Sequence, residues 1–561
     1  MALKEIPFPG SEDLVMDEQE PGATPEVQAS VEPLVGEDAP RIVGRRLVET
    51  AESMARKQRQ ISVSEFFSKN RHLLGFDNPK RALLTAVKEA VDNSLDACEE
   101  AGILPEIQVE LEDLGEDRFR AMVEDNGPGI VKAQVPNIFG KLLYGSKFHR
   151  LKMSRGQQGI GISAAGMYGL ITTGRPMEIV TRVSEKKPAY SVSLRIDTKK
   201  NKAELLDEQE VEWTRPHGTK VTIYFEGRYQ KGRQSVDEFL RQVAISNPHL
   251  NLHYRAPDGE ITTYVRSVDE LPPPTAEIKP HPRGVELGIL QAMLRDSATR
   301  TISAFLQEEF SRVSKRVAEE MCERAEISPK AWTTRITREK LEDLMKAMAA
   351  TKIHNPPTNC VAPIGEEQLV KGLSSVVQAD FYASTTRPPS VYRGNPFIIE
   401  AALAYGGDQP GDQQARLLRF ANRVPLLYQQ GACACSAAAT EVNWRSYKLT
   451  QPRSSVPVAP LTIVLHMASV WVPFTSESKE AIAGYQEIED EMVKALQECG
   501  SKLRIYLSAQ RRGVEQDKKH KYIATYLPHI ALGLRELLDL DDKRERSVLD
   551  ELDRILAGVR D

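Results

Sequence analysis

The stretch that most limits how this chain can fold is a strongly amphipathic segment at residues 78–101, NPKRALLTAVKEAVDNSLDACEEA. Its apolar residues recur every three or four positions, the spacing that places side chains on one stripe of a helix. The stripe consists of Leu83, Leu84, Val87, Val91 and Leu95. Because such a helix is stable only when its apolar face is covered, the segment predicts a packed layer beside it.

Segments of alternating apolar and polar residues can supply that layer. EIQVELEDL and RFRAMVED follow the helix and end at a Gly/Pro turn at residues 126–130. Alternation returns in PMEIVTRV, AYSVSLRID and GTKVTIYFEG, after a glycine-rich stretch at residues 139–169. This order predicts an α+β sandwich with helices on one face of a sheet.

From about residue 280 the pattern changes. ELGILQAMLRDSATRTISAFLQEEF, SRVSKRVAEEMCERA and residues 328–350 have helical spacing and predict a small all-α insert. After residue 388, NPFIIEAALAYGG, ARLLRFANRVPLLYQ and LTIVLHMASVWVPF predict strands of a second α/β unit. Residues 479–506 and 517–561 are charged and helical, so we expect a multidomain α+β chain.

Composition excludes several classes of protein. No run approaches eighteen apolar residues and the N-terminus lacks an apolar signal segment, which argues against a membrane span and against secretion. The six cysteines show no repeated spacing. Cys433 and Cys435 form a CxC motif, but no second Cys/His pair stands near them to complete a zinc site. We expect a cytoplasmic protein without a metal at this motif.

The net charge of -5 is unevenly distributed along the chain. Residues 1–40 contain ten Asp/Glu and one Lys, a net of -9, so residues 41–561 carry about +4. Residues 1–45 are rich in Pro, Glu, Gly and Val and predict a disordered acidic tail, with order beginning near residues 51–70. Basic clusters in the remainder permit contacts to a phosphate backbone, although such clusters are also typical of solvated faces.

The amphipathic helix carries the first candidate site. Glu89 and Asn93 are four residues apart, so both project from one face about a turn apart. A carboxylate beside an amide suits a site in which one polarises water and the other holds a divalent cation such as magnesium. The alternative is that both belong to the solvent face of an ordinary helix.

The second candidate is the turn Glu124-Asp125-Asn126-Gly127-Pro128-Gly129. An aspartate at a strand end can accept a hydrogen bond from an exocyclic amino group such as that of adenine. Gly127 and Gly129 would let the backbone approach a ring closely. The same letters are also typical of a plain turn.

The third candidate is the glycine-rich loop SRGQQGIGIS at residues 154–163, before a helix expected at Ala164. Backbone N–H groups of such a loop can cradle phosphates. The spacing GxxGxG does not match the dinucleotide fingerprint. Upstream, residues 140–147 imitate a Walker A loop, but Ser146 precedes Lys147, the reverse of the order that this loop needs. Both residues remain candidates to reach a nucleotide from a lid.

In this order, the elements resemble the GHKL ATPase family, which has the Bergerat fold. The turn follows the Glu/Asn pair by about 32 residues, the lid follows by about 31 more, and Gly218-Thr219 lies on a later strand. The resemblance implies that Glu89 is the general base for ATP hydrolysis, Asn93 ligates Mg²⁺, Asp125 binds the adenine amino group and Thr219 supports the adenine subsite. It implies that the phosphates are wrapped by Gly156, Gln157, Gln158, Gly159, Ile160, Gly161, Ile162 and Ser163.

Other stretches resemble the B subunits of type IIB DNA topoisomerases, the topoisomerase VI family. These are QRQISVSEFFSKNR, YGSKFHRLKMSRGQQGIGISAA, RPPSVYRGNPFIIEAALAYGG and FANRVPLLYQ, and the resemblance covers most of residues 50–561. It implies a GHKL ATPase domain at 46–278, a helix-two-turns-helix domain at 279–360, a transducer domain at 361–541 and a C-terminal helix at 542–561 that docks the A subunit. Lys479 matches the switch lysine that reaches from the transducer to the ATP γ-phosphate; the alternative is a surface lysine.

The resemblance also implies partners. They are the A subunit of topoisomerase VI in an A2B2 heterotetramer, a second B subunit in an ATP-dependent homodimer, and duplex DNA. We find neither an acidic DxD cluster nor a candidate catalytic tyrosine in a winged-helix context, so DNA cleavage is assigned to the A subunit. The apolar spacing of residues 547–559 fits a docking helix, although it also fits a helix packed on its own chain.

We therefore hypothesise that the chain belongs to an ATP-dependent DNA topoisomerase associated with the nucleoid. ATP dimerises two GHKL domains near residues 61–70, closure captures a duplex, and hydrolysis rotates the transducers through Lys479. Candidates for duplex contact are Arg511, Arg512, Lys518, Lys519, Lys521, Lys315 and Arg316. The alternatives are a GHKL chaperone or mismatch-repair-like ATPase, a non-enzymatic scaffold and a histidine kinase. RPPSVYRGNPF and the helical insert argue against the first alternative, and the intact Glu89, Asn93 and Lys479 argue against the second. The third is disfavoured because no phosphoacceptor His stands in a dimerisation helix before the ATPase region.

Overall fold

The computed structural model describes residues 41–43, 46–48, 51–57, 61, 65–66, 69–145, 150–156, 159–197, 201–476 and 478–558. They fall into two units, residues 1–61 and 62–561. In the first, β1 (Arg41–Val43) pairs antiparallel with β2 (Arg46–Val48), and α1 (Ala51–Lys57) follows. The prediction of a disordered tail to residue 45 is therefore wrong for Arg41–Val43, while residues 1–40 and 44–45 lie outside the described residues.

The second unit begins with an eight-stranded sheet. Its strands are β3 (Glu106–Asp113), β4 (Arg118–Asp125), β5 (Met177–Arg182), β6 (Ala189–Asp197), β7 (Lys202–Val211), β8 (Gly218–Glu226), β9 (Asn251–Arg255) and β10 (Ile261–Tyr264). The spatial order is β10-β9-β3-β4-β8-β5-β6-β7. All neighbours are antiparallel except β3 and β9, which are parallel. Alternate residues of β3 and β4 are buried, as the sequence pattern predicted.

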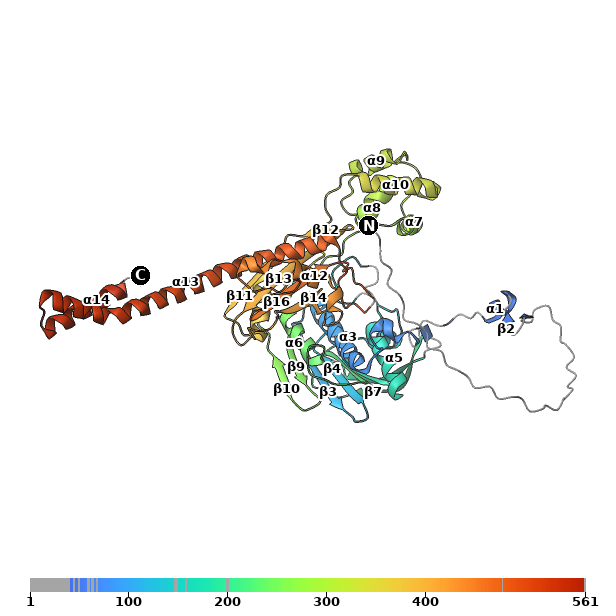
Figure 1. The fold of residues 1–561 in the computed structure, drawn as a ribbon. Coiled ribbons are helices and arrows are strands. Elements are labelled where there is room, and N and C mark those ends of the chain that lie inside the picture. Colours follow the sequence, from blue (N-terminus) through green and yellow to red (C-terminus); the bar gives the residue numbers. More distant parts are fainter. Residues whose placement is uncertain are drawn as a thin grey trace, which may run out of the picture. The chain divides into compact units, whose positions relative to one another are not determined.

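Helices α3 (Pro79–Glu100), α5 (Gly161–Thr173) and α6 (Val236–Ser246) pack on this sheet (Figure 1). The short helix α4 (Val135–Gly140) contacts α5. The long helix α3 begins where Asn78 accepts a hydrogen bond from Lys80 N and Pro79 occupies the first helical position. All five residues of its predicted apolar stripe are buried in the domain core. The predicted stripe is thus confirmed.

A helical insert follows with a hydrophobic core of its own. Its helices are α7 (Leu287–Asp296), α8 (Ile302–Glu309), α9 (Lys315–Arg324) and α10 (Arg338–Ala350). Ser314 and Thr337 cap α9 and α10 by accepting hydrogen bonds from the backbone three residues on. Residues 328–332 are not helical, so the helix expected to run through 328–350 is confirmed only from Arg338 onward.

The last domain packs helices on a second sheet. The strands are β11 (Phe381–Thr386), β12 (Ser390–Tyr392), β13 (Asn395–Tyr405), β14 (Arg416–Ala421), β15 (Val424–Pro425) and β16 (Leu461–Ser469). Their order is β11-β13-β16-β14-β15, with β12 paired to β13. The strands β13 and β16 are buried almost throughout because α11 (Glu366–Val376), α12 (Ala434–Glu441) and α13 (Gln486–Leu538) supply apolar residues to the clusters around them.

The helix α13 extends well past the sheet on which it starts. Its residues contribute to the domain core as far as Leu507, and Pro528 lies inside its distal part. There it pairs with the terminal helix α14 (Asp542–Gly558). Arg535 forms ion pairs with Asp542 and Glu545, and Leu556 is buried. Among the described residues, no helix has both the length and the apolar character needed to cross a bilayer.

Several elements were missed or misplaced by the sequence patterns. The helix expected at Ala164 begins at Gly161, and β7, β9, β10, α6 and α11 were not predicted. The strand β7 is mostly exposed and charged, so it lacks the alternation that marks a half-buried strand. Its pairing with β6 holds it in the sheet.

Candidate nucleotide site

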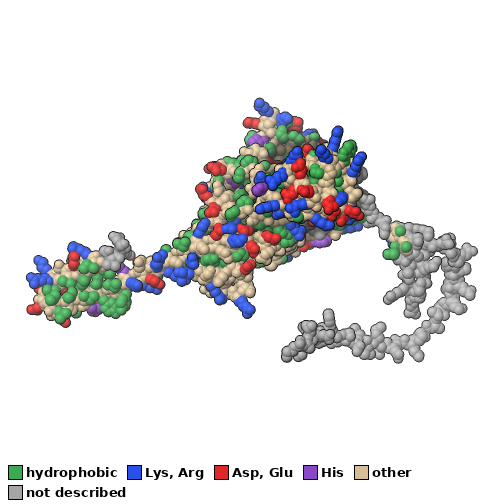
Figure 2. Space-filling view, turned by 90° about the horizontal axis from the view of Figure 1, so that it is seen from above, with side chains coloured by type: hydrophobic (Ala, Val, Ile, Leu, Met, Phe, Trp, Pro, Cys, Tyr) green, Lys and Arg blue, Asp and Glu red, His purple; other side chains and the backbone are tan. Residues whose placement is uncertain are grey.

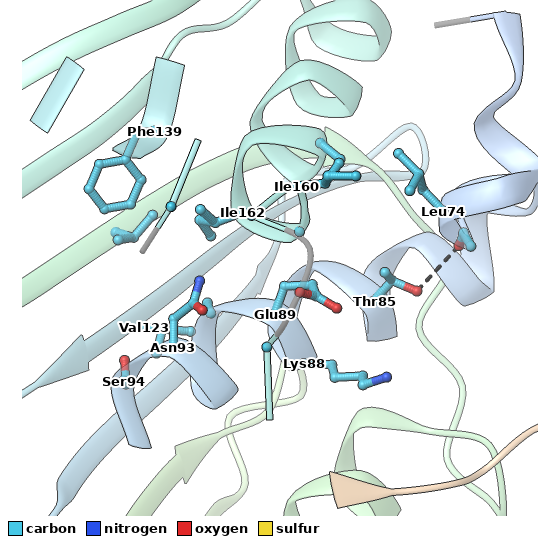
Figure 3. A pocket seen from close by; sticks show the side chains of 18 of the residues that line it. Leu74, Thr85, Lys88, Glu89, Asn93, Ser94, Val123, Phe139, Ile160 and Ile162 are labelled. Atoms are coloured by element: carbon cyan, nitrogen blue, oxygen red, sulfur yellow. Dashed lines mark hydrogen bonds between the residues drawn. The ribbon is translucent and has the colours of Figure 1, made fainter. Parts of the chain in front are cut away.

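A cavity of about 620 Å³ lies where α3, the end of β4 and the start of α5 meet. Residues 425–428 and 478–480 of the last domain also line it. Figure 3 shows Glu89 and Asn93 projecting from α3 toward the segment that carries Ile160 and Ile162. The cavity therefore brings together the three predicted motifs and a portion of the loop that contains Lys479.

The carboxylate of Glu89 lies directly against the first residue of α5. A Cβ atom at Gly161 would lie only 1.7 Å from Glu89 Oε2. Glycine is thus required there by the carboxylate opposite, because any side chain would displace it. Asn93, one turn farther along α3, is exposed to the cavity, and its Oδ1 lies 4.0 Å from the position that a Cβ of Gly156 would take.

Asp125, at the end of β4, is buried at the cavity wall. Its Oδ2 accepts a hydrogen bond from Ser94 Oγ at 2.9 Å, and its Oδ1 accepts from Gly127 N at 2.9 Å and Thr219 N at 3.1 Å. Burial raises the pKa of Asp125, against these hydrogen bonds, which lower it. The bonds fix the carboxylate in one orientation toward the cavity.

The glycines of the turn serve two different purposes. A Cβ at Gly129, which has a φ of 70°, would lie 2.1 Å from Arg182 O, so this glycine permits a close approach between the turn and β5. Gly129 lines the cavity, whereas Gly127 contacts Asp125 from behind and lies outside the lining. Thr219 lines the cavity too, on β8 directly opposite Asp125.

Some residues of the glycine-rich loop 156–163, here called the lid, line the cavity and others do not. Gly156, Gly159, Ile160, Gly161 and Ile162 all line the cavity, and the last two begin α5, whose N-terminal N–H groups suit an anion. The Ser163 hydroxyl instead donates to Ile138 O and Lys141 O, at 3.0 and 2.9 Å, and does not line the cavity. Ser146, Lys147, Gln157 and Gln158 lie outside the described residues.

Lys479 reaches the cavity from the last domain. It has a φ of 54°, and its N–H donates to Ser476 O at 3.0 Å, so a tight turn presents its side chain. Burial lowers the pKa of Lys479, although Glu89 opposes the shift. The neighbouring Glu480 forms an ion pair with Arg81 of α3, whose guanidinium also lies 5.5 Å from the centre of the Tyr428 ring.

A row of acidic residues continues along α3 beyond Glu89. Burial raises the pKa of Asp92 to about 7, with Glu89 and Asp96 adding to the shift and Lys88 and Arg155 opposing it. Arg155, buried at the base of the lid, donates to Asp96 Oδ1 at 2.8 Å and to both oxygens of Glu99 at 2.7 Å. Burial alone would raise the pKa of Glu99, but Arg155 and His249 hold it well below its usual range.

Sequence patterns missed much of the cavity wall. The missed residues are mostly apolar and come from distant segments, among them Leu74, Phe76, Ile138, Phe139, Leu426, Leu427 and Tyr428. Lys88 was missed as well, although it adjoins Glu89 in the sequence. Nothing in a single sequence separates these side chains from ordinary core or surface residues.

The CxC motif does not line this cavity. Cys433 and Cys435 are buried free thiols, and Cys433 Sγ accepts a hydrogen bond from Ile482 N at 3.4 Å. Within the described residues of the chain, no three His, Cys, Asp or Glu residues are grouped as a metal site would need.

The sheet and cavity correspond to a known class of nucleotide-binding domain. A profile described as histidine kinase-, DNA gyrase B-, and HSP90-like ATPase matches residues 82–221, which include α3, Asp125, the lid and Thr219. A second profile, described as topoisomerase VI B subunit, transducer, matches residues 356–519. Fold, site and profile together define an ATPase domain of the GHKL class.

Relatives that match most of the chain then identify the family. The B subunit of type 2 DNA topoisomerase 6 from Methanococcoides burtonii is 47% identical over 492 residues, covering 88% of this chain and 79% of that protein. The protein of the same name from Archaeoglobus fulgidus is 46% identical, covering 90% and 83%, and that from Pyrococcus horikoshii is 37% identical, covering 86% and 93%. The chain belongs to the family of type 2 DNA topoisomerase 6 B subunits.

Proposed function

We propose that the chain binds and hydrolyses ATP as the B subunit of a DNA topoisomerase. The observation that carries this proposal is the contact between Glu89 and Gly161, in one cavity with Asn93 and Asp125. It places a carboxylate between an amide-bearing helix face and the N-terminus of a lid helix. That arrangement suits hydrolysis of a bound nucleotide better than binding without turnover.

Each described residue has a separate task in this proposal. The fixed carboxylate of Asp125 accepts a hydrogen bond from the adenine amino group. The N–H groups at the start of α5 hold the phosphates. Glu89 accepts a proton from the attacking water, a role worth roughly 10²- to 10⁴-fold in rate. Thr219 supports Asp125 through its N–H group.

Magnesium fits the residues on this face of α3. Asn93 offers an amide oxygen near Gly156, and magnesium prefers few protein ligands beside phosphate and water oxygens. When bound, the ion would neutralise charge on the phosphates. Asn93 would hold the ion through its amide oxygen.

Lys479 couples the nucleotide to the transducer. Its ammonium gains a partner when a terminal phosphate is present and loses it when that phosphate leaves. Since Lys479 belongs to the last domain and Glu89 to the first, this change favours one angle between the two domains over another. Two copies of the chain dimerise with ATP bound, and the closed pair holds a DNA duplex.

The hairpin of α13 and α14 is the proposed site for the A subunit, which cleaves DNA. Large apolar side chains on it are more than a third exposed: Tyr522, Ile523, Tyr526, Ile530, Leu532, Leu537, Leu538 and Ile555. Figure 2 shows green side chains gathered over this end of the chain. A patch of this kind marks a protein interface. It supports docking of the A subunit on this hairpin, to which both helices contribute, and the A2B2 stoichiometry is part of the proposal.

Exposed basic residues supply candidate DNA contacts. Arg511, Arg512, Lys518, Lys519 and Lys521 lie on α13, and Lys315 and Arg316 begin α9. All seven are exposed. Contacts from such side chains to phosphates give binding that is sensitive to salt and tolerant of sequence.

Glu89→Ala tests the proposal. We expect ATP turnover to fall by at least about 100-fold, while binding of a fluorescent ATP analogue and nucleotide-dependent dimerisation persist. Glu100→Ala, at the exposed end of the same helix, is the matched control. Full hydrolysis by Glu89→Ala would refute the assigned base.

A second assay tests the division of labour. With a cognate A subunit, the chain should relax supercoiled DNA only when ATP and magnesium are present. Relaxation by the chain alone would refute the assignment of cleavage to the partner. ATP hydrolysis without any relaxation in the complex would instead favour a chaperone or mismatch-repair-like ATPase.

A further inference from the structure

The segment that leads into the lid, residues 151–155, packs against the transducer and not only against its own domain. Met153 contacts a buried apolar cluster formed by Cys360, Val361, Ile398, Ala468 and Val470, which come from the linker after the insert and from β13, β16 and the residue just after β16. Met153 N also donates to Cys360 O at 2.9 Å, and Ile278 N donates to Leu151 O at 3.1 Å. The base of the lid is thus seated in the surface of another domain.

Asn422, in the turn between β14 and β15, binds Ser154, the residue after Met153. Its Nδ2 donates to Ser154 O and to Ser469 O, each at 3.0 Å, and its Oδ1 accepts from Ser469 N at 2.9 Å. The backbone of Asn422 is left-handed, with a φ of 48°. Because both ends of its amide are engaged, the side chain connects Ser154 rigidly to β16.

Arg155, the following residue, is held by the ATPase domain instead. It donates to Asp96 and Glu99 of α3 and to Asn247 Oδ1 at 2.6 Å, and the side chain is only 4% exposed. The same helix α3 carries Glu89 and Asn93. Two consecutive residues are therefore bonded to two different domains, immediately before Gly156 on the cavity wall.

We propose that Asn422 clamps the base of the lid to the transducer, so that lid position and transducer rotation are coupled independently of Lys479. If the transducer turns relative to α3, Ser154 must follow Asn422 while Arg155 stays with Asp96 and Glu99. The backbone between them then changes direction, and Gly156 moves. Asn422 is a positioning residue in this scheme, since it acts on the nucleotide only through the lid.

The buried ion pairs of Arg155 hold this residue firmly to α3. A guanidinium paired with two carboxylates in a buried site is costly to separate, because each charge would be left without a partner. The hydrogen bonds of the Asn422 amide and of Met153 N join neutral groups and are weaker, and the Met153 side chain makes apolar packing with its cluster. Rotation should therefore strain the Asn422 side before the Arg155 side.

Asn422→Gly tests the coupling, because glycine accepts the left-handed backbone and removes the side chain that bonds Ser154 to Ser469. The inference depends on the proposed function, so the assay measures both activities in the complete complex with the A subunit. We expect ATP hydrolysis to stay within about threefold of the parent, while DNA relaxation per ATP hydrolysed falls about three- to tenfold. We also expect amide hydrogen exchange in residues 151–155 to quicken about tenfold.

Asn395→Ala is the matched control, since its amide donates to Arg393 O inside the transducer and does not contact the lid. An unchanged ratio of relaxation to hydrolysis in Asn422→Gly would overturn the proposal. A proportional fall of both activities, or an equal effect of Asn395→Ala, would also overturn it.

If Asn422→Gly does not fold, the ratio of DNA relaxation to ATP hydrolysis in Asn422→Asp decides, because aspartate is close to asparagine in shape and lacks the N–H donor to Ser154 O and Ser469 O. Failure of the parent complex to relax DNA would count against the proposed function alone. In that case the exchange of residues 151–155 still tests the clamp.

Discussion

Alanine at position 161 would place a methyl group against the carboxylate of Glu89. The new Cβ would lie 1.7 Å from Oε2, 2.4 Å from Cδ and 2.9 Å from Cγ, whereas ordinary contact begins at 3.4 Å. The carboxylate must therefore retreat by about 1.7 Å. A misplacement of roughly 1 Å can lower a rate 100-fold, which corresponds to about 2.7 kcal/mol in the activation free energy. We expect the kcat for ATP hydrolysis to fall by at least that factor.

Stability should change little in this variant. Gly161 begins α5 without a positive φ, and alanine favours helix and restricts the unfolded chain. Glu89 is half-buried and borders a cavity, so it can move aside without leaving the protein interior. Steady-state ATPase kinetics and thermal melting of the purified chain, side by side, check both statements.

The control for Gly161→Ala is Gly288→Ala. Gly288 lies in the first turn of α7 and would meet nothing within 4 Å. This change should leave kcat unaltered. A Gly161→Ala protein whose kcat stays within twofold of the parent would show that Glu89 need not stand where the structure puts it, and the general-base assignment would fail.

Two further changes probe the charges around the site. An Asp92 pKa of about 7 means that the folded state holds a proton that the unfolded state loses above pH 4, so this residue lowers stability as the pH rises from about 4 to 7. Asp92→Asn should therefore be more stable than the parent at pH 8, by up to about 4 kcal/mol in urea unfolding, and no different at pH 4; a constant difference at every pH would contradict the assignment. Arg81→Glu should slow ATP turnover roughly tenfold by breaking the ion pair beside Lys479, and Glu480→Arg in the same chain should restore most of it. No recovery in the double variant would show that the pair does not position Lys479.

The site residues that could be predicted from the sequence are those whose positions depend on local structure. Glu89 and Asn93 could be placed on one face because a helical period fixes their relation, and the buried stripe of α3 fixes which face is inward. Asp125 and Gly129 were recognisable from a strand followed by a Gly/Pro turn. That these elements enclose one cavity follows from the family resemblance, and the structure agrees for the residues it describes.

Contacts between distant segments account for what was not predicted. Arg155 lies in a glycine-rich loop, where a charged side chain is usually exposed. It is buried because it pairs with Glu99 of α3, and this pairing was not predictable because the two residues are 56 positions apart. Asn422 gave no signal at all, since its role depends on a turn meeting the backbone of Ser154, 268 residues away. Ser163 was expected at the phosphates, but local geometry turned its hydroxyl toward Ile138 and Lys141. A single sequence does not show which distant segments contact each other, so these contacts could not be predicted.

The length of α13 has a mechanical consequence. From Leu507, the last residue that it contributes to the core of the sheet domain, to its end at Leu538, the helix spans roughly 45 Å at about 1.5 Å per residue. Each degree by which the domain tilts then displaces the far end by roughly 0.8 Å. A tilt of several degrees would therefore move the hairpin of α13 and α14 by several ångströms, provided that the helix does not yield at Pro528. A helix of this kind acts as a lever arm, so the movement at its far end depends on its stiffness.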